Sequence, residues 1–277
     1  MKKLLSLSWL SISAVLLLLT GCGKSKSEPS SELQNPDTAA VVFGPSLAEL
    51  FVAGGIDYRL AAVDRFTILP DSVQVQVAGD FLSPSLELIY SLGTTSIHVI
   101  GTNQSLVDLA DRMGIPYYNY SFDTLDDVFE VCRELESRYP DAELDEFIFS
   151  VEHKLDSVAG SGLPRISIMP VIYFQEDGAI TVAGRGTFFE DIITGIGCEH
   201  AAPETGTYPM VSVEGVMEMA PDIIIVFAPG ADSEEILNRW EGYGLGTDNV
   251  TVLNGDHVLM PGSHLPELIV EISRCLE

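Results

Sequence analysis

Basic residues are scarce in this sequence, which has 14 lysines and arginines against 41 aspartates and glutamates and a formal net charge of −27. A protein that binds nucleic acid neutralises phosphates with lysine and arginine, so this imbalance argues against a nucleic-acid partner. The excess of acids favours solubility. An arginine that falls in a candidate binding loop is therefore informative.

Metal-binding and hydrolytic motifs are also missing. The four cysteines include no pair at C-x-x-C spacing and the five histidines are scattered, so no zinc or iron–sulfur site is indicated. The sequence contains neither G-x-S-x-G nor H-E-x-x-H. We expect no resident metal, no cofactor and no enzyme activity. A receptor for free Zn²⁺ or Mn²⁺ and an exported hydrolase remain as alternatives.

A long apolar run occurs only at the N-terminus. Two lysines precede mostly apolar residues 4–19, and a Leu-Thr-Gly-Cys sequence that resembles a lipobox ends at Cys22. This pattern predicts a signal peptide over residues 1–21, export, and lipidation of Cys22 as the membrane anchor. An uncleaved anchor is the alternative, but the run is short for a full span. Residues 22–38 are polar and predict a flexible tether.

Strand and helix patterns alternate through the rest of the chain. Apolar runs at residues 39–43, 60–63 and 97–100 predict strands, and helical spacing of apolar residues predicts helices over residues 105–113 and 124–139. Such alternation is typical of an α/β fold with a largely parallel sheet covered on both faces.

The clearest helical pattern lies in the middle of the chain. One apolar stripe runs through residues 141–158, between two halves that each show strand–helix alternation. We therefore predict an N-terminal α/β lobe over residues 39–140, a bridging helix over 141–160 and a C-terminal α/β lobe over 161–277.

The two halves contain an internal repeat. The pattern S-x-E-x-[IV]-x-x-[LM] begins at Ser85 and again at Ser212, 127 residues later, and an apolar strand pattern follows each copy. A looser match relates the segment that begins at Ser46 to the segment that begins at Thr187. Two matches in the same order predict two lobes of like topology.

Each half also opens with a glycine-containing turn that leads into a helix, with Ser46 as the expected N-cap of the first. Helix N-termini and the carboxyl ends of parallel strands are places where ligands bind, so we expect a ligand cleft between the lobes. The expected contact residues lie in such turns or just after predicted strands: Ser46, Arg65, Phe66, Asp80, Phe81, Tyr173, Arg185, Thr187, Phe188, Tyr208, Met210 and His257.

The composition of this set indicates the kind of ligand. Aromatic side chains with a few polar groups suit a large, flat or chelated molecule. Arg65 and Arg185 can pair with ligand carboxylates, which favours an anionic ligand. Phe188 stands in the first turn of a helix and can equally belong to the core.

Five segments resemble, in order, the substrate-binding proteins of ABC importers for cobalamin and iron-siderophores. They are FGPSLAELFVAGGIDYRLAAVDRF, AGDFLSPSLELIYSL, VAGRGTFFEDIITGIG, YPMVSVEGVMEMAPDIIIVF and GDHVLMPGSHLPELI. The resemblance covers the chain from residue 39 and implies two Rossmann-like lobes joined by a single long α-helix, with limited hinge motion. It implies a monomer that binds a ferric siderophore, cobalamin or haem in the inter-lobe cleft and delivers it to an ABC permease dimer.

The same resemblance implies that Glu87 and Glu214, one in each lobe, dock on arginines of the permease. Their matched places in the repeat favour this role. The alternative is that both are acids at helix starts, where the helix dipole stabilises negative charge.

The remaining cysteines give one further prediction. Export favours disulfides, and Cys198 and Cys275 both fall in the predicted C-terminal lobe, so we predict a bond between them. Cys132 falls in a predicted helix and is expected to be a buried thiol.

Overall fold

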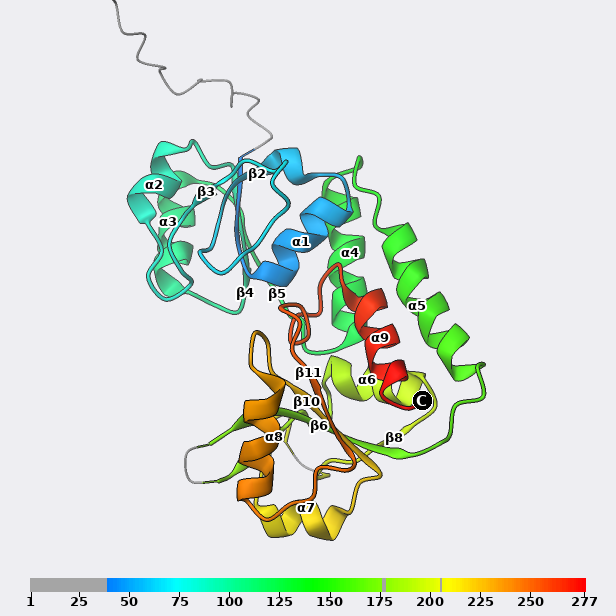
Figure 1. Cartoon of the computed structure of the whole chain (residues 1–277). Helices are drawn as coiled ribbons and strands as arrows, with labels where there is room; N and C mark the ends of the chain where they lie inside the picture. Colours follow the sequence, from blue (N-terminus) through cyan, green and yellow to red (C-terminus); the bar gives the residue numbers. More distant parts are fainter. Residues whose placement is uncertain (1–38, 176–177, 205) are drawn as a thin grey trace, which may run out of the picture. The chain divides into compact units, whose positions relative to one another are not determined.

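The computed structural model describes residues 39–175, 178–204 and 206–277, where strands and helices alternate to form two sheets (Figure 1). The predicted signal peptide, the lipidation site Cys22 and the predicted tether lie outside the described residues. Within the described part of the chain, no helix combines the length and apolar character needed to cross a membrane.

The N-terminal sheet is parallel throughout and has the strand order β3-β2-β1-β4-β5. Its strands are β1 (Ala40–Phe43), β2 (Leu60–Val63), β3 (Gln76–Val77), β4 (Ser96–Ile100) and β5 (Tyr117–Tyr120). The predicted strands at the first three apolar runs are thereby confirmed.

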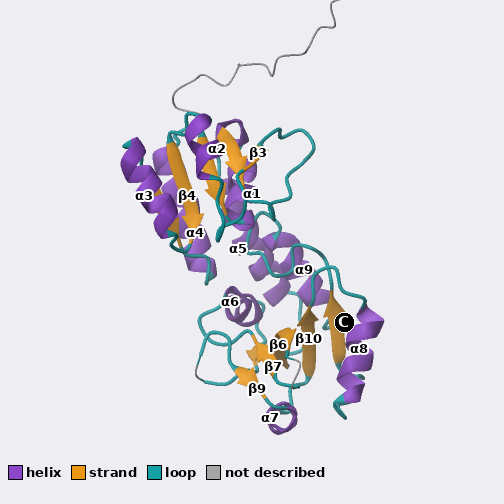
Figure 2. Ribbon diagram, turned by 90° about the vertical axis from the view of Figure 1, so that its left-hand side faces the viewer, coloured by secondary structure: helices purple, strands orange, loops and turns teal. Residues whose placement is uncertain are grey.

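The side chains of β1 alternate between the two faces of this sheet, as the twofold period of a strand requires. Val41 and Phe43 join the apolar cluster that includes helices α2 (Leu86–Ser91) and α3 (Gln104–Met113). Ala40 and Val42 join the cluster that includes α1 (Pro45–Ala53) and α4 (Leu125–Arg138). Figure 2 shows α3 on one side of the sheet and α1 on the other. The helices are α1 (Pro45–Ala53), the 3-10 helix η1 (Asp57–Arg59), α2 (Leu86–Ser91), α3 (Gln104–Met113) and α4 (Leu125–Arg138).

Local capping explains three of these helix ends. The Asn103 side chain accepts hydrogen bonds from the first amides of α3, and left-handed Gly114 ends that helix. Thr124 and Asp127 form a capping box at the start of α4. The prediction of Ser46 as an N-cap is wrong, because Gly44 is the N-cap of α1 and a proline, whose missing N–H costs nothing there, is the first helical residue.

The C-terminal sheet has the order β11-β10-β6-β7-β9, and β8 also pairs with β6. The pairs β11–β10, β10–β6 and β6–β8 are parallel, while the pairs β6–β7 and β7–β9 are antiparallel. The elements are β6 (Ser167–Phe174), β7 (Ile180–Val182), α6 (Phe188–Gly195), β8 (Glu199–His200), β9 (Met210–Val211), α7 (Val213–Met219), β10 (Ile223–Phe227), α8 (Ser233–Gly242), β11 (Val250–Leu253) and α9 (Leu265–Arg274).

Helix α5 (Asp145–Ala159) stands in the chain between the two sheets and begins four residues later than the apolar stripe predicts. The cause is Glu136 of α4, whose Oε1 accepts hydrogen bonds from the backbone amides of Leu144, at 2.7 Å, and Asp145, at 2.9 Å. Helix α5 packs against α4, α6 and α9 (Figure 1). Its role as the bridge between two lobes stays a prediction.

One apolar core runs through both parts of the structure. The same cluster contains Val42 of β1, Leu135 of α4, Ile148 of α5, Phe227 of β10 and Ile269 of α9, all buried. Moving the two sheets far apart would expose this surface to water, at a cost of ~25 cal/mol per Å². The continuous core therefore favours limited hinge motion.

Candidate functional site

Asp64 organises the loops at the carboxyl ends of β1 and β2. It is buried, and its carboxylate accepts hydrogen bonds from the backbone amides of Gly44, at 2.6 Å, and Phe66, at 2.7 Å. One acid therefore fixes both the turn into α1 and the loop that carries Arg65. Asp64 was not among the predicted contact residues, although an acid directly after a buried strand is a signal that could have found it.

Arg65 and Asp80 form an ion pair beside these loops, with 3.1 Å between guanidinium nitrogen and carboxylate oxygen. The backbone amides of Leu82, at 3.0 Å, and Ser83, at 2.7 Å, donate to Asp80 Oδ1. Gly79 makes this turn possible, because its φ is 91° and an added Cβ would lie 2.5 Å from the Ser83 carbonyl oxygen. Two predicted contact residues thus lie together, but the arginine is already matched by an acid.

Large apolar side chains are exposed in the same loops. Phe66 is 67%, Ile68 72% and Leu82 87% exposed. Phe81 is half-buried against the cluster formed with α2 and α3, and its carbonyl oxygen accepts a hydrogen bond from Asn103 Nδ2 at 2.5 Å. Exposed apolar side chains on adjoining loops are typical of a binding surface.

Arg185 is paired with acids as well. Its guanidinium lies 2.5 Å from a Glu190 carboxylate oxygen and 3.6 Å from one of Glu204. The Gly186 amide donates to the other Glu190 oxygen at 2.8 Å. Burial alone would raise the pKa of Glu190, but the hydrogen bonds from Arg185 and Gly186 outweigh it and hold that pKa below its ordinary value. Glu190 is therefore ionised at neutral pH.

Three predicted contact residues are buried inside helices or their caps. Thr187 is the N-cap of α6, where its hydroxyl donates to the Gly184 carbonyl at 2.8 Å and accepts from the Glu190 amide at 3.3 Å. Phe188 lies in the core, with its ring centroid 4.0 Å from that of Phe189. Ser46 is buried on α1. The structure corrects these assignments, since the three side chains serve packing and capping instead of a surface.

Tyr173, Tyr208 and Met210 are exposed or about half-exposed, as a contact role requires. Burial, and then the nearby Asp123 carboxylate, raise the pKa of Tyr208 above its ordinary value. The Asp123 carbonyl also accepts a hydrogen bond from the Phe188 amide at 2.6 Å. Tyr208 therefore lies close to the segment that leads from β5 into α4.

His257 belongs to a different group of side chains. Its Nε2 lies 3.1 Å from a Glu271 carboxylate oxygen, and its ring centroid lies 5.3 Å from that of His264. Both partners lie in the segment that contains α9. None of the hydrogen bonds or ion pairs found in the described residues joins His257 to another predicted contact residue.

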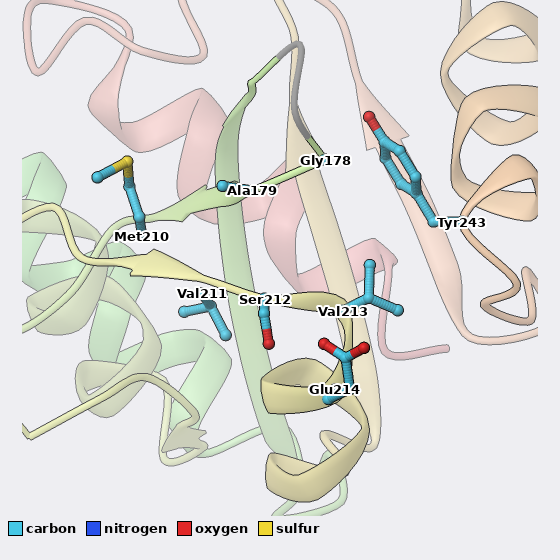
Figure 3. Close-up of a pocket in the computed structure, with 8 residues that line it drawn as sticks. All are labelled: Gly178, Ala179, Met210, Val211, Ser212, Val213, Glu214 and Tyr243. Atoms are coloured by element: carbon cyan, nitrogen blue, oxygen red, sulfur yellow. The ribbon is translucent and has the colours of Figure 1, made fainter.

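A pocket of about 530 Å³ lies beside β9 and α7 (Figure 3). Its lining includes two of the predicted functional residues, Met210 and Glu214. The full lining is Gly178, Ala179, Met210, Val211, Ser212, Val213, Glu214 and Tyr243. Neither arginine takes part in it, so this pocket is separate from the arginine loops.

Known binding proteins resemble this chain in sequence and in fold. No protein-family model matches the chain. A vitamin B12-binding protein of Vibrio campbellii is 20% identical over 255 residues, which cover 90% of this chain and 92% of that protein. The structure of a possible iron-binding, periplasmic solute-binding protein from Staphylococcus epidermidis matches with a TM-score of 0.71 and 18% identity over 85% of this chain and 97% of that one. The chain has the periplasmic binding-protein fold.

A further structural match with this binding-protein fold is the periplasmic haem-binding protein of Vibrio cholerae, at a TM-score of 0.69 and 20% identity, over 86% of this chain and 98% of that one. These matches confirm the resemblance that the five ordered segments indicated. They also confirm the predicted α/β class, with two sheets rich in parallel strands.

The two acids implied in docking occupy equivalent places in the binding-protein fold. Glu87 and Glu214 are the second residues of α2 and α7, each helix follows a serine at its N-cap, and both acids are exposed. The backbone at Glu214, and then the Ser212 hydroxyl, lower the pKa of Glu214 through hydrogen bonds. The next strands, β4 and β10, each pair with the first strand of their sheet. The internal repeat is thus real at this point, while docking stays a prediction.

The predicted Cys198–Cys275 disulfide is wrong, because both cysteines are free in the structure. The two sulfur atoms face different carbonyl oxygens. Cys198 Sγ lies 3.8 Å from the Pro164 carbonyl oxygen, and Cys275 Sγ lies 3.3 Å from the Glu271 carbonyl oxygen. Cys132 is buried in α4, as predicted.

Metal ligands do not gather in the part of the chain that the structure describes. No group of three or more His, Cys, Asp or Glu side chains there is arranged to hold a metal ion. The two closest histidines, His257 and His264, each pair with a glutamate of their own.

Proposed function

We propose that this chain is an exported binding protein, without catalytic activity, that takes up a metal chelate between its two lobes and delivers it to an ABC permease dimer. The observation that carries the proposal is that exposed Phe66, Ile68 and Leu82 lie on two loops that the Arg65–Asp80 ion pair joins. The first of these loops follows the carboxyl end of a parallel strand, where ligands bind in such sheets. Proteins that this chain resembles in sequence or in fold are named as a vitamin B12-binding protein, a haem-binding protein and a possible iron-binding protein.

The second lobe contributes the opposite wall in this proposal. Tyr208 offers an aromatic side chain there, and it is about half-exposed. The backbone of Asp123 connects the two parts of the chain, since its carbonyl oxygen accepts a hydrogen bond from the Phe188 amide at 2.6 Å. If a bulky chelate contacts both walls, an alanine variant in either lobe should reduce the contact area between the protein and the chelate.

Calorimetric titration of the purified chain tests the proposal. The probes are cyanocobalamin, haemin and a ferric siderophore, with Zn²⁺ and Mn²⁺ as bare-ion controls and a chromogenic ester as a control for hydrolysis. The proposal expects one chelate bound per chain, released unchanged, with no ester turnover. Phe66→Ala should weaken that binding, because it removes contact area, while Phe149→Ala, an exposed phenylalanine on α5, is the matched control. Saturable binding of a bare ion alone would contradict the proposal.

The proposal includes anchoring through a lipid on Cys22, supported by the apolar run and the Leu-Thr-Gly-Cys sequence that precede the tether. The Cys22→Ser variant should leave the membrane fraction or accumulate with its signal peptide intact. If it fractionates like the wild type, the anchor is not at Cys22. The chain is proposed to act as a monomer, which sedimentation analysis of the lipid-free form checks.

A further inference from the structure

The two arginines of the proposed site are both cancelled by fixed carboxylates. Arg65 faces Asp80 at 3.1 Å, and Arg185 faces Glu190 at 2.5 Å and Glu204 at 3.6 Å. The first loop therefore has no net charge from its pair, and the second has one acid in excess. This count alters what the arginines offer to a ligand.

The cancelling acids cannot simply turn away to make room for a ligand carboxylate. Asp80 is tied to the backbone by the amides of Leu82 and Ser83. Glu190 is tied by the Gly186 amide, and it stands in the first turn of α6, where negative charge is favoured. An anion that approached either arginine would meet a fixed carboxylate next to it, and like charges at such distances repel.

The rest of the surroundings add negative charge and apolar surface. Asp123 is the charged group that acts on Tyr208, and the exposed side chains next to Arg65 are Phe66 and Ile68. All other described basic residues lie elsewhere in the sequence than these loops: Arg59, Arg112, Arg133, Arg138, Lys154, Arg165, Arg239 and Arg274. The residues that flank the two arginines in these loops are thus apolar or acidic, with a slightly negative balance.

We propose that Asp80 and Glu190 are specificity-determining residues, which neutralise Arg65 and Arg185 so that the site takes an uncharged or cationic chelate and discriminates against anionic ones. The inference rests on the proposed function, because it assigns a charge class to the ligand of that site. It replaces the expectation of an anionic ligand that the two arginines suggest when the sequence is read without their partners.

Calorimetry with chelates of different charge tests the inference. The probes are cyanocobalamin, which is uncharged, ferrioxamine B, which is cationic, and haemin and ferric enterobactin, which are anionic. The wild type should bind an uncharged or cationic probe at least tenfold more tightly than either anionic probe, a difference of ~1.4 kcal/mol. Tighter binding of an anionic probe would overturn the inference while leaving the proposed function intact. Binding of none of the four would refute both.

Two near-isosteric variants make the test specific to the named acids. Asp80→Asn and Glu190→Gln keep an oxygen that accepts the backbone hydrogen bonds but free the arginines, so each should improve binding of an anionic probe by roughly tenfold, the value of a charge-assisted hydrogen bond. The matched control is Glu152→Gln, an exposed acid on α5, which removes the same charge and should change nothing. Equal gains in all three variants would show an effect of net charge only and would overturn the assignment.

Discussion

Glu49 of α1 accepts two hydrogen bonds from Ser263, which lies 214 residues further along the chain, one from its backbone amide at 3.0 Å and one from its hydroxyl at 3.2 Å. Burial is the main cause that raises the pKa of Glu49, while His264 and Ser263 oppose it. The carboxylate is therefore a buried polar link between the first helix and the segment that enters the last one, and removing its partners would leave it unsatisfied.

Gly262, next to Ser263, is predicted to be intolerant of a side chain. A Cβ there would collide with the Glu49 carboxylate and lie 3.2 Å from the Ser46 Cα. Gly262→Ala should lower the free energy of unfolding by ~1–3 kcal/mol, the usual cost of overpacking. Gly242→Ala is the control, because that glycine has open space around it. Chemical denaturation measures both, and equal stability of the two variants would argue against the packing described for Glu49.

His98 is predicted to make the fold sensitive to acid. Its ring nitrogens lie 3.0 Å from the hydroxyls of Tyr120 and Ser96, and the Tyr139 hydroxyl lies 2.9 Å away. Burial, and then the charge of Arg138, lower the pKa of His98 from its ordinary 6.5 to about 3. Between pH 6.5 and about pH 3, the unfolded chain binds a proton at His98 that the folded chain does not bind. The free energy of unfolding therefore decreases by ~1.4 kcal/mol for each unit by which the pH is lowered through this range.

Urea denaturation between about pH 7 and pH 4.5 checks this. His98→Gln should be less stable at pH 7 but should lose less stability on acidification than the wild type. His153→Gln is the matched control, since that side chain is exposed on α5 and meets water in both states. If the free energy of unfolding depends on pH in the same way in the wild type and in His98→Gln, His98 is not the group that makes the fold sensitive to acid.

Features with a local cause could be predicted from the sequence. The ends of α3 follow from Asn103 and Gly114, and the start of α4 follows from Thr124 and Asp127, all within a few residues. The alternation of apolar runs and helical stripes also indicated the two sheets correctly. The late start of α5 was not predictable in this way, because the acid that caps it belongs to α4.

The candidate site was harder to predict because its chemistry depends on partners. Arg65 was correctly predicted to follow a strand, but no residue near it in the sequence indicates that Asp80, 15 residues further along, is its ion-pair partner. Phe188 could be a contact or a core residue until its ring was seen against Phe189. Side-chain direction likewise decided against the disulfide, since two cysteines in one lobe need not face each other.

The cysteines give a chemical prediction. Mass spectrometry of the unreduced, lipid-free chain should find three free thiols, at Cys132, Cys198 and Cys275. Burial, and then Glu136, raise the pKa of Cys132 to about 12, so this thiol should react slowest with an alkylating reagent in the native state and normally after denaturation. A product lighter by two hydrogens, with Cys198 and Cys275 unreactive, would contradict the structure.

Permease docking is predicted to depend on charge at both matched acids. Glu87 and Glu214 are exposed, and Glu214 is also one of the residues that line the pocket in Figure 3. The double variant Glu87→Arg, Glu214→Arg should keep wild-type ligand affinity but lose most transport and permease association, because paired charges at an interface set its orientation. Single variants should fall between. Glu218→Arg, an exposed acid on α7, is the control, and transport at the wild-type rate in the double variant would refute docking.

The absorbance spectrum and mass of the molecule that copurifies with the chain from cells grown in rich medium report most directly on whether the chain binds an intact chelate. We expect a single metal chelate, at one per chain, whose mass is unchanged by binding and which is lost when Phe66 and Tyr208 are both replaced by alanine. A preparation that carries only a bare metal ion, or a small molecule without metal, would contradict this expectation.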